Sequence, residues 1–366
     1  MACLFQQKRL LLLFCLILPL IGFIAAPLEA RLFYNPHLTY SCYRLIDLGP
    51  TDLPQCCLAR DSFPVSLGPR INQKGHVIGN TSYGGFVTDL CNPKSCFQRN
   101  GTYAFFHGIN NNGLVLASVN QADGSGEWYL WSYVYCRHQE TPLPLNLKCL
   151  NGGDVHFRSI NDNGLLTGAR KVKDKEEYMA VFYSPEKGIQ DLSCAYLLGA
   201  NNSGNMVGFE SPSDENTPLL YHYRGGWNGF SDEACLKKPK GKIQFQMDMT
   251  IAHDSAVFGS FRSTKNGRPY MWAYEWTPIE RYFRVRDLSG MKISAVNSCH
   301  TIVGSLCGEA AISINMEPPV VLSSLVHGGC KEMTLIEATD INDVGQIVGY
   351  GRSCGSLHLF LLDPIR

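Results

Sequence analysis

A nine-residue motif occurs seven times along this chain of 366 residues. Its consensus is Ile-Asn-x-x-Gly-x-Val-x-Gly, and the copies start at Ile71, Ile109, Ile160, Ala200, Ile251, Val296 and Ile341. The first and last copies start 270 residues apart, so the six steps average 45 residues. That period is typical of a four-stranded propeller blade. The repeat therefore predicts an all-β fold: a seven-bladed β-propeller with four strands in each blade.

The start of each motif is predicted to be the turn of a β-hairpin. Asn at the first turn position bonds readily to its own backbone two residues on, and Gly suits the fourth position, where a side chain would resist the backbone conformation. The intact pairs are Asn72 with Gly75, Asn110 with Gly113, Asn161 with Gly164, Asn201 with Gly204, and Asn342 with Gly345. The fifth copy has Ala252 and Ser255 at these positions, and the sixth has Asn297 and His300.

The segments after each hairpin complete the predicted blade. Apolar, aromatic runs such as residues 179–183 and 271–274 are predicted to be the third strand, because aromatic and β-branched residues favour strands. Runs that end in Asp-Leu, such as Asp191-Leu192 and Asp287-Leu288, are predicted to be the fourth. The last glycine of the motif is expected where a neighbouring strand comes close.

The chain ends before the seventh repeat reaches an Asp-Leu strand, and residues 42–49 supply such a strand at the other end. We expect this N-terminal strand to pair with residues 357–362 and to complete the last blade, because a propeller that does not close leaves two sheet edges open. The alternative is an open array of sheets.

The hairpin half of the repeat, best seen in residues 341–349, resembles the bacterial extracellular repeats of the HAF family, and the resemblance covers roughly residues 43 to 366. The His-Ala-Phe run that names the family is replaced here by sequences such as Tyr103-Ala104-Phe105. The resemblance implies a secreted repeat protein and no defined activity.

The first 30 residues have the pattern of a signal peptide. Lys8 and Arg9 precede an apolar run over residues 10–26, and cleavage is expected after Ala26 or Ala30. The protein is then expected to be secreted, periplasmic or on the cell surface, with residues 31–366 as a single propeller domain. An uncleaved N-terminal anchor is the alternative, and no second membrane-spanning segment is predicted.

The chain carries 32 basic and 32 acidic residues, so no net charge favours nucleic acid. Of its 15 cysteines, two lie in the predicted signal. An exported chain with this many thiols is expected to form disulfides. The spacing suggests the pairs Cys91–Cys96, Cys136–Cys149, Cys299–Cys307 and Cys330–Cys354, although spacing does not fix connectivity.

The sequence contains no motif that predicts a catalytic, cofactor or metal site. His253-Asp254 could be half of a catalytic pair, but it aligns with turn residues of the other copies, which favours a turn. The acidic residues that a glycosidase would need, such as Glu177 and Glu275, lie in different repeats. Trp227, which follows Gly225 and Gly226, is the best candidate for a ligand contact from a loop.

Three functions are compatible with these features. The first is a binding scaffold for a protein or a glycan, because propellers present variable loops around a central channel and the fold alone does not set the function. The second is a carbohydrate-active enzyme that uses carboxylates at the channel. The third is a structural envelope protein that is cross-linked through its cysteines. The sequence favours binding over the structural role, and the structural role over the enzyme.

Overall fold

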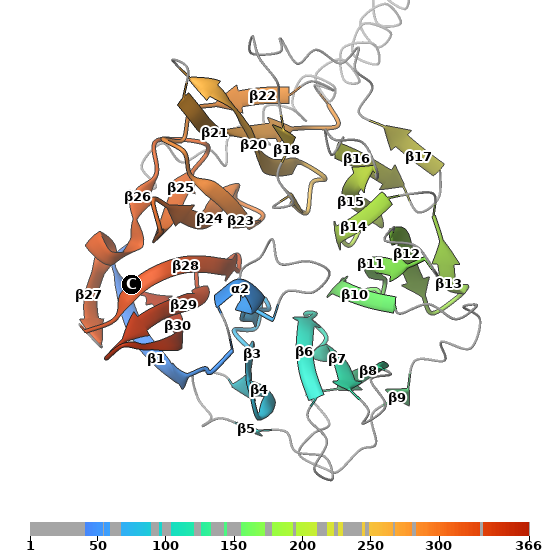
Figure 1. The fold of residues 1–366 in the computed structure, drawn as a ribbon, viewed down its shortest axis with the longest axis horizontal. Helices are drawn as coiled ribbons and strands as arrows, with labels where there is room; N and C mark the ends of the chain where they lie inside the picture. Colours follow the sequence, from blue (N-terminus) through green and yellow to red (C-terminus); the bar gives the residue numbers. More distant parts are fainter. Residues whose placement is uncertain are drawn as a thin grey trace, which may run out of the picture. The chain divides into compact units, whose positions relative to one another are not determined.

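The strands of this protein form sheets that each contain one copy of the repeated motif (Figure 1). The computed structural model describes residues 41–365, except for gaps at 54, 59–66, 89–94, 97–103, 121–125, 133–142, 145–154, 173–177, 193–194, 211–217, 223–225, 230–243, 246–248, 266–267, 280–282 and 330–331. Chain contacts separate residues 1–41 from residues 42–366, and the fold belongs to the second unit. The predicted signal peptide lies outside the described residues. No helix in the described part of the chain is long and apolar enough to cross a membrane.

Within the described ranges, the strands group into seven sheets of four or five strands. In chain order of their motifs, these sheets contain β2 (Arg70–Ile71), β3 (Val77–Thr81), β4 (Gly84–Thr88) and β5 (Ser95–Cys96); β6 (Ala104–Ile109), β7 (Leu114–Asn120), β8 (Gly126–Ser132) and β9 (Leu143–Pro144); β10 (Val155–Ile160), β11 (Leu166–Lys171), β12 (Tyr178–Ser184) and β13 (Gly188–Asp191); β14 (Ala195–Ala200), β15 (Asn205–Glu210), β16 (Pro218–His222) and β17 (Gly226–Gly229); β18 (Gln244–Phe245), β19 (Thr250–Ile251), β20 (Val257–Lys265), β21 (Arg268–Trp276) and β22 (Phe283–Arg286); β23 (Lys292–Val296), β24 (Thr301–Leu306), β25 (Glu309–Ile314) and β26 (Val320–Val321); and β28 (Thr334–Ile341), β29 (Ile347–Ser353), β30 (Ser356–Pro364), β1 (Tyr43–Pro50) and β27 (Val326–Gly329). Two short helical segments are α2 (Gln55–Leu58) and the 3-10 turn η2 (Leu322–Leu325).

The strand order within a sheet follows the predicted order of the repeat. In the third sheet the order is β10, β11, β12, β13, so the motif hairpin comes first, the aromatic strand third and the strand ending at Asp191 last. The last glycine of the motif lies against the preceding strand, as expected, in the third, fourth, sixth and seventh repeats, at Gly168, Gly208, Gly304 and Gly349. At Gly168, for example, a Cβ atom would collide with the carbonyl group of His156.

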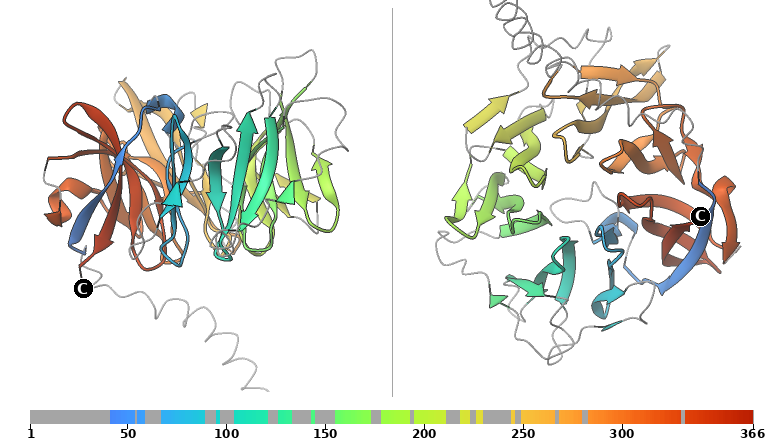
Figure 2. Two further views of the ribbon diagram at one scale, coloured as in Figure 1. Left: turned by 90° about the horizontal axis from the view of Figure 1, so that it is seen from below. Right: turned by 180° about the vertical axis from the view of Figure 1, so that it is seen from behind.

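The motif strands are the innermost strands of their sheets, and they contact one another in a closed cycle. β2 contacts β6, and the contacts continue through β10, β14, β19, β23 and β28 back to β2. The views in Figure 2 show the sheets arranged around a common axis. The fold is therefore all-β, with its sheets in a propeller-like ring.

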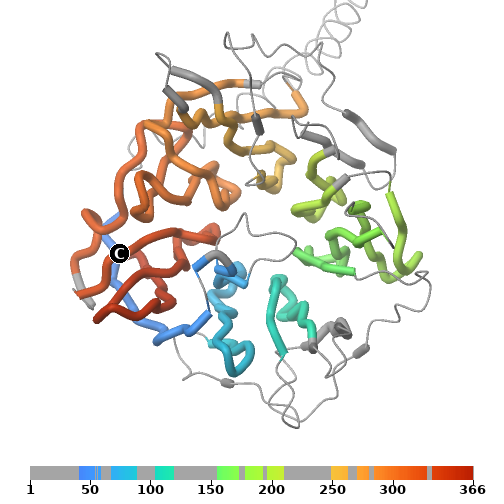
Figure 3. The backbone as a smooth tube through the Cα atoms, in the orientation of Figure 1, coloured from blue at the N-terminus to red at the C-terminus, as the bar shows by residue number. Residues whose placement is uncertain are grey.

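The ring closes through a sheet that is built from both ends of the described chain. β1 pairs with β30 in antiparallel register from Tyr43 opposite Pro364 to Pro50 opposite His358. Figure 3 shows this as the blue N-terminal strand beside the red C-terminal strand. The predicted pairing of an N-terminal strand with residues 357–362 is confirmed. On its other side β1 pairs in parallel with β27, which adds a fifth strand to this sheet.

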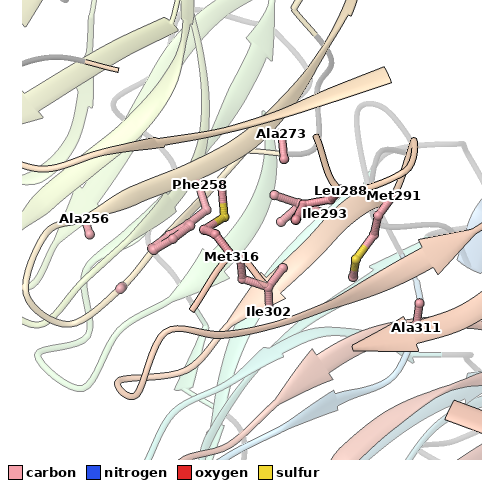
Figure 4. Close-up of a cluster of buried hydrophobic side chains, with 10 residues drawn as sticks. Ala256, Phe258, Ala273, Leu288, Met291, Ile293, Ile302, Ala311 and Met316 are labelled. Atoms are coloured by element: carbon pink, nitrogen blue, oxygen red, sulfur yellow. The ribbon is translucent and has the colours of Figure 1, made fainter. Parts of the chain in front are cut away.

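Apolar side chains fill the space between neighbouring sheets. The cluster in Figure 4 joins the fifth and sixth sheets, with Phe258 from β20, Ala273 from β21 and Ile302 from β24 all buried. Similar clusters lie at other junctions, including one where Leu361 of β30 and Val348 of β29 pack with Val77 of β3. Burial of these side chains holds the sheets face to face.

Candidate functional site

The seven motif turns gather around the axis, and their backbone geometry is the one predicted. In each turn the residue at the Gly position donates its N–H to the carbonyl of the residue at the Asn position, with N···O distances of 3.1 Å. Gly75, Gly113, Gly164, Gly204 and Gly345 all have a positive φ, between 74° and 85°. Ser255 and His300 adopt the same conformation, with φ of 71° and 55°, although they carry side chains.

The asparagines of the motif form a hydrogen-bonded ring, which we call the asparagine ring. Its members are Asn72, Asn110, Asn161, Asn201, Asn297 and Asn342. In all six, the side-chain Oδ1 accepts a hydrogen bond from the backbone N–H four residues further along. In all six, Nδ2 donates to the backbone carbonyl at the same position of the next repeat, over 2.8 to 3.2 Å. The bond from Asn342 to Asn72 joins the last repeat to the first.

The asparagine ring has a single gap among these turns, at the fifth repeat. Ala252 has no amide group, so its repeat sends no such bond to Asn297. Within the fifth turn, the Oδ1 atom of Asp254 accepts the hydrogen bond of the Ala256 N–H at 3.0 Å. Asp254 thus satisfies the backbone group that an asparagine side chain satisfies in the other repeats.

A second set of polar side chains, which we call the mouth ring, comes from the position after the asparagine. Its members are Gln73, Asn111, Asp162, Asn202, His253, Ser298 and Asp343. Most of them bond across repeats: the N–H of Asn111 donates to Asp162 at 2.7 Å, and the N–H of Asp162 donates to Asn202 at 2.9 Å. The N–H of Asp343 donates to Oε1 of Gln73 at 2.7 Å, again joining the last repeat to the first.

Two cavities lined by described residues lie along the axis. The mouth cavity, of about 190 Å³, is lined by both polar rings. The channel cavity, of about 180 Å³, is lined by the inner strands. Both cavities share the first motif residues of five repeats, which are Ile109, Ile160, Ala200, Ile251 and Val296. These aliphatic side chains form a collar between the polar turns and the channel.

The ionisable residues that line the channel cavity are Arg70, His107, Arg158 and Asp340. Burial lowers the pKa of His107, and repulsion from His156 and Arg70 acts in the same direction; together they bring it to about 3. His107 is therefore neutral near pH 7, and its Nε2 lies 2.7 Å from the hydroxyl oxygen of Ser118. The Asp340 carboxylate accepts hydrogen bonds from the N–H groups of Ile71 and Ile341.

The two turns that depart from the motif are linked by an ion pair. The Nε2 atom of His300 lies 2.9 Å from Oδ2 of Asp254, and its Nδ1 atom lies 3.7 Å from Oε1 of Glu275. The hydrogen bond to Asp254 raises the pKa of His300 against the opposing effect of burial. For Asp254, burial acts to raise the pKa, but hydrogen bonds from His300 and the Ala256 N–H outweigh it, so the pKa is lowered. The ring of Phe258 meets the imidazole edge-on.

The other candidates from the sequence are dispersed. His253 is exposed in the fifth turn, so His253-Asp254 is part of a turn, and the imidazole that pairs with Asp254 is that of His300. Glu275 lies in β21, whereas Glu177 falls outside the described residues. In the described ranges, no group of three or more His, Cys, Asp or Glu side chains is placed to hold a metal ion.

The prediction that Trp227 lies in a loop is wrong. Trp227 lies in β17, the outermost strand of its sheet, where it pairs with Tyr221. The two glycines before it suggested a loop, but Gly226 continues the strand by pairing with His222. β17 lies on the outside of the ring (Figure 1). The side chain of Trp227 lies outside the described part of the molecule.

The predicted Cys299–Cys307 disulfide is also wrong. Both thiols are free and exposed. Cys299 lies in the turn before β24 and Cys307 follows its other end. A strand of six residues separates them by roughly 20 Å, far beyond disulfide reach. Cys354 is likewise a free thiol, so its predicted bond to Cys330 is not formed, and Cys330 is outside the described residues. The side chains of Cys91, Cys96, Cys136 and Cys149 are outside the described residues as well.

The sequence interpretation missed the residues that line the channel. Arg70 and Asp340 lie one residue before the motif, and His107 and Arg158 lie two residues before it. An alignment of the repeats that extended two residues upstream of Ile71 and its equivalents could have found them.

No protein-family model matches the sequence, and no curated protein matches it. Solved structures resemble its fold. An oligogalacturonate lyase in complex with manganese is 12% identical, with a TM-score of 0.55, over 90% of this chain and 95% of that one. The extracellular domain of a putative one-component system from B. thetaiotaomicron is 9% identical over 88% of this chain, with a TM-score of 0.47, and this chain spans 40% of its length. An ulvan lyase is 8% identical over 86% of this chain and 95% of its own, with a TM-score of 0.44. At such identities the likeness concerns the fold alone.

Proposed function

We propose that this protein is an exported, seven-bladed β-propeller of the HAF type that binds a glycan at its mouth ring. The observation that carries the proposal is the mouth cavity, around which every repeat places a polar side chain. Amide, carboxylate, imidazole and hydroxyl groups are the donors and acceptors that sugar hydroxyls need. The predicted signal peptide over residues 1–30 supports the same function, because an exported protein meets displayed glycans.

The mouth ring is suited to binding because its side chains are held in place before a ligand arrives. Asp162 accepts hydrogen bonds from the N–H and the side-chain amide of Asn111 and from the side-chain amide of Asn202. Asp343 accepts bonds from the N–H and the hydroxyl group of Ser298. A carboxylate has about four acceptor positions, so each one retains capacity for a ligand hydroxyl group. Preorganisation of this kind lowers the entropic cost of binding.

A carbohydrate-active enzyme is the second candidate, and one similar structure is an oligogalacturonate lyase. The feature that favours it is His300 between Asp254 and Glu275, an arrangement that can hold an imidazole for proton transfer. Among the described residues that line the two axial cavities, however, none belongs to this trio. Binding at the mouth is therefore the function that the geometry supports better.

The test is a thermal-shift screen of the protein against neutral and acidic oligosaccharides. A ligand at 100 times its Kd should add about 2.7 kcal/mol of stability. His253→Ala should weaken binding, because His253 is an exposed member of the mouth ring. Glu186→Ala is the matched control, since Glu186 is exposed in the turn between β12 and β13. The proposal would be overturned by a flat response to the whole panel, or by a ligand whose binding both variants weaken equally. Release of a cleaved product would instead establish the enzyme.

A further inference from the structure

The channel cavity differs chemically from the mouth. Arginine side chains remain protonated at any accessible pH. Arg70 and Arg158 therefore place two positive charges on the lining, against one negative charge from Asp340. His107 adds no charge near neutral pH, because burial lowers its pKa to about 3. The described lining is thus positive overall, although the whole chain is neutral.

The charges in this cavity are poorly screened by water. Arg70, His107 and Arg158 are each at most 5% exposed. Charges in such surroundings interact far more strongly than they do at the surface. The Asp340 carboxylate is engaged with the backbone N–H groups of Ile71 and Ile341 at the junction of the first and last repeats. Arg70 donates to the carbonyl of Thr339 at the same junction, which fixes its position.

Small residues at the position just before the motif leave open space in the wall of this cavity. The position before the motif is Gly108, Ser159, Gly199, Thr250 and Ala295 in five repeats, and all five line the cavity. At Gly199, an added Cβ atom would meet no atom closer than Cγ2 of Ile251 at 4.0 Å. The repeats therefore combine a basic segment of the wall with an open one.

We propose that the channel cavity is a binding site for a small anion or for one anionic group of a larger ligand, held by the guanidinium groups of Arg70 and Arg158. Guanidinium groups bind carboxylate, sulfate and phosphate through paired hydrogen bonds, so the site accepts these oxyanions as a class. It lies beyond the aliphatic collar from the mouth ring and is independent of glycan binding there.

The experiment titrates the protein with sodium sulfate, sodium phosphate and sodium glucuronate, each against sodium chloride at equal ionic strength, and follows the thermal midpoint. Sulfate and phosphate stabilise many proteins without a site, so the readout is a saturable shift at low concentration. Glucose is the neutral counterpart of glucuronate. A response to sulfate or phosphate alone identifies a tetrahedral oxyanion, whereas a response to glucuronate and not to glucose identifies a carboxylate.

Substitution at Gly199 provides a variant that keeps both arginines. Gly199→Asp should introduce a carboxylate into the cavity and abolish the saturable shift, and without added anion it should melt at a higher temperature than Gly199→Ala. Gly199→Ala, the matched control, should keep the shift. Arg158→Gln should weaken anion binding about tenfold or more, as expected for loss of a charged hydrogen bond.

Two outcomes would overturn the proposal. One is the lack of a saturable shift in the wild-type protein with all three anions. The other is an equal shift in the wild type and in Gly199→Asp, which would show that the anions act on the surface in general. If Arg158→Gln does not fold, the Gly199 pair still decides the question. His253→Ala, in the mouth ring, should leave the anion response unchanged.

Discussion

The asparagine at the second motif position stabilises two structures with one amide group. Its Oδ1 atom closes its own turn, and its Nδ2 atom reaches the next repeat. Because both atoms are used, neither aspartate nor leucine could replace it: aspartate lacks the donor and leucine lacks both groups. This double use explains why the asparagine occurs in six of the seven copies of the motif.

The fifth repeat offers a direct test of this role. Ala252→Asn should restore the missing member of the asparagine ring by donating to the carbonyl of Asn297. We expect the free energy of unfolding to rise by about 1 kcal/mol, the usual net value of one intramolecular hydrogen bond. Chemical denaturation would measure it. Ala252→Leu has a side chain branched at the same carbon as asparagine but without the amide, and it should destabilise the protein, since Ala252 is buried. Equal losses from both substitutions would contradict the proposed role of the amide.

The sequence predicted the turn residues well because their role is local. Asn161 and Gly164, for example, are fixed by the requirements of one four-residue turn: Oδ1 of Asn161 accepts the N–H of Asn163, two residues on, and Gly164 has a positive φ, both as predicted. The partner of each asparagine in the next repeat was not predictable in the same way. Asn161 and Asn201 are 40 residues apart, so their contact depends on how the sheets are placed around the axis.

At the scale of elements, the fifth and sixth hairpins lack the turn glycine and are stabilised by side-chain contacts instead. Ser255 and His300 carry a positive φ that glycine adopts at lower cost. In return, Ser255 Oγ is 2.9 Å from Nδ2 of Asn201, and His300 pairs with Asp254. The sequence shows the departure at His300 but not its partner, because the ion pair joins two turns 46 residues apart.

This pair predicts a pH dependence of stability. The pKa of His300 is raised in the folded state above 6.5, so its contribution is complete below that pH and is lost as pH rises through the folded value. The pKa of Asp254 is lowered below 3.8, so its contribution is complete above that pH and is lost as pH falls through the folded value. The pair should therefore stabilise the protein most between about pH 4 and 6.5.

The measurement compares unfolding of the wild type and His300→Gln from pH 3 to 9. Their difference in unfolding free energy should peak in that window and stay below about 1 kcal/mol, because Asp254 is more than half exposed. Asp254→Asn keeps the oxygen that accepts the Ala256 N–H bond and removes the charge. It should therefore lose the same pH-dependent contribution to the unfolding free energy as His300→Gln. A difference that does not vary with pH would show that the ion pair contributes nothing.

At the scale of the whole molecule, closure of the ring depends on two strands from opposite ends of the chain. β1 and β30 pair along almost their full length, and without this pairing each would expose an open edge. This closure was predictable because the seventh repeat lacks a strand that the N-terminus supplies. The parallel pairing of β1 with β27 was not predictable, since Val326 to Gly329 carries no repeat signal.

A disulfide across the closing strands tests how much this pairing contributes. Arg44 and Asp363 are direct partners in the register and are 319 residues apart in sequence. Facing residues in antiparallel strands lie about 4.5–5.5 Å apart between Cα atoms, within disulfide range. The variant Arg44→Cys with Asp363→Cys should therefore form a bond that restricts the unfolded chain, with an upper limit of about 5 to 6 kcal/mol for so long a loop. The loss of the exposed Arg44–Asp363 ion pair, 3.0 Å long, should cost less than about 1 kcal/mol.

The comparison is best made in a Cys42→Ser background, because Cys42 is a free, exposed thiol beside the new pair. The oxidised double variant should unfold at a clearly higher temperature than the same protein after reduction, and Arg44→Cys alone should show no such redox dependence. If β1 separates from β30 before the rest of the ring unfolds, the disulfide removes that early step and the gain approaches its upper limit. If the ring unfolds elsewhere first, the bond forms without raising the unfolding temperature, and closure by β1 is then not what limits the stability of the molecule.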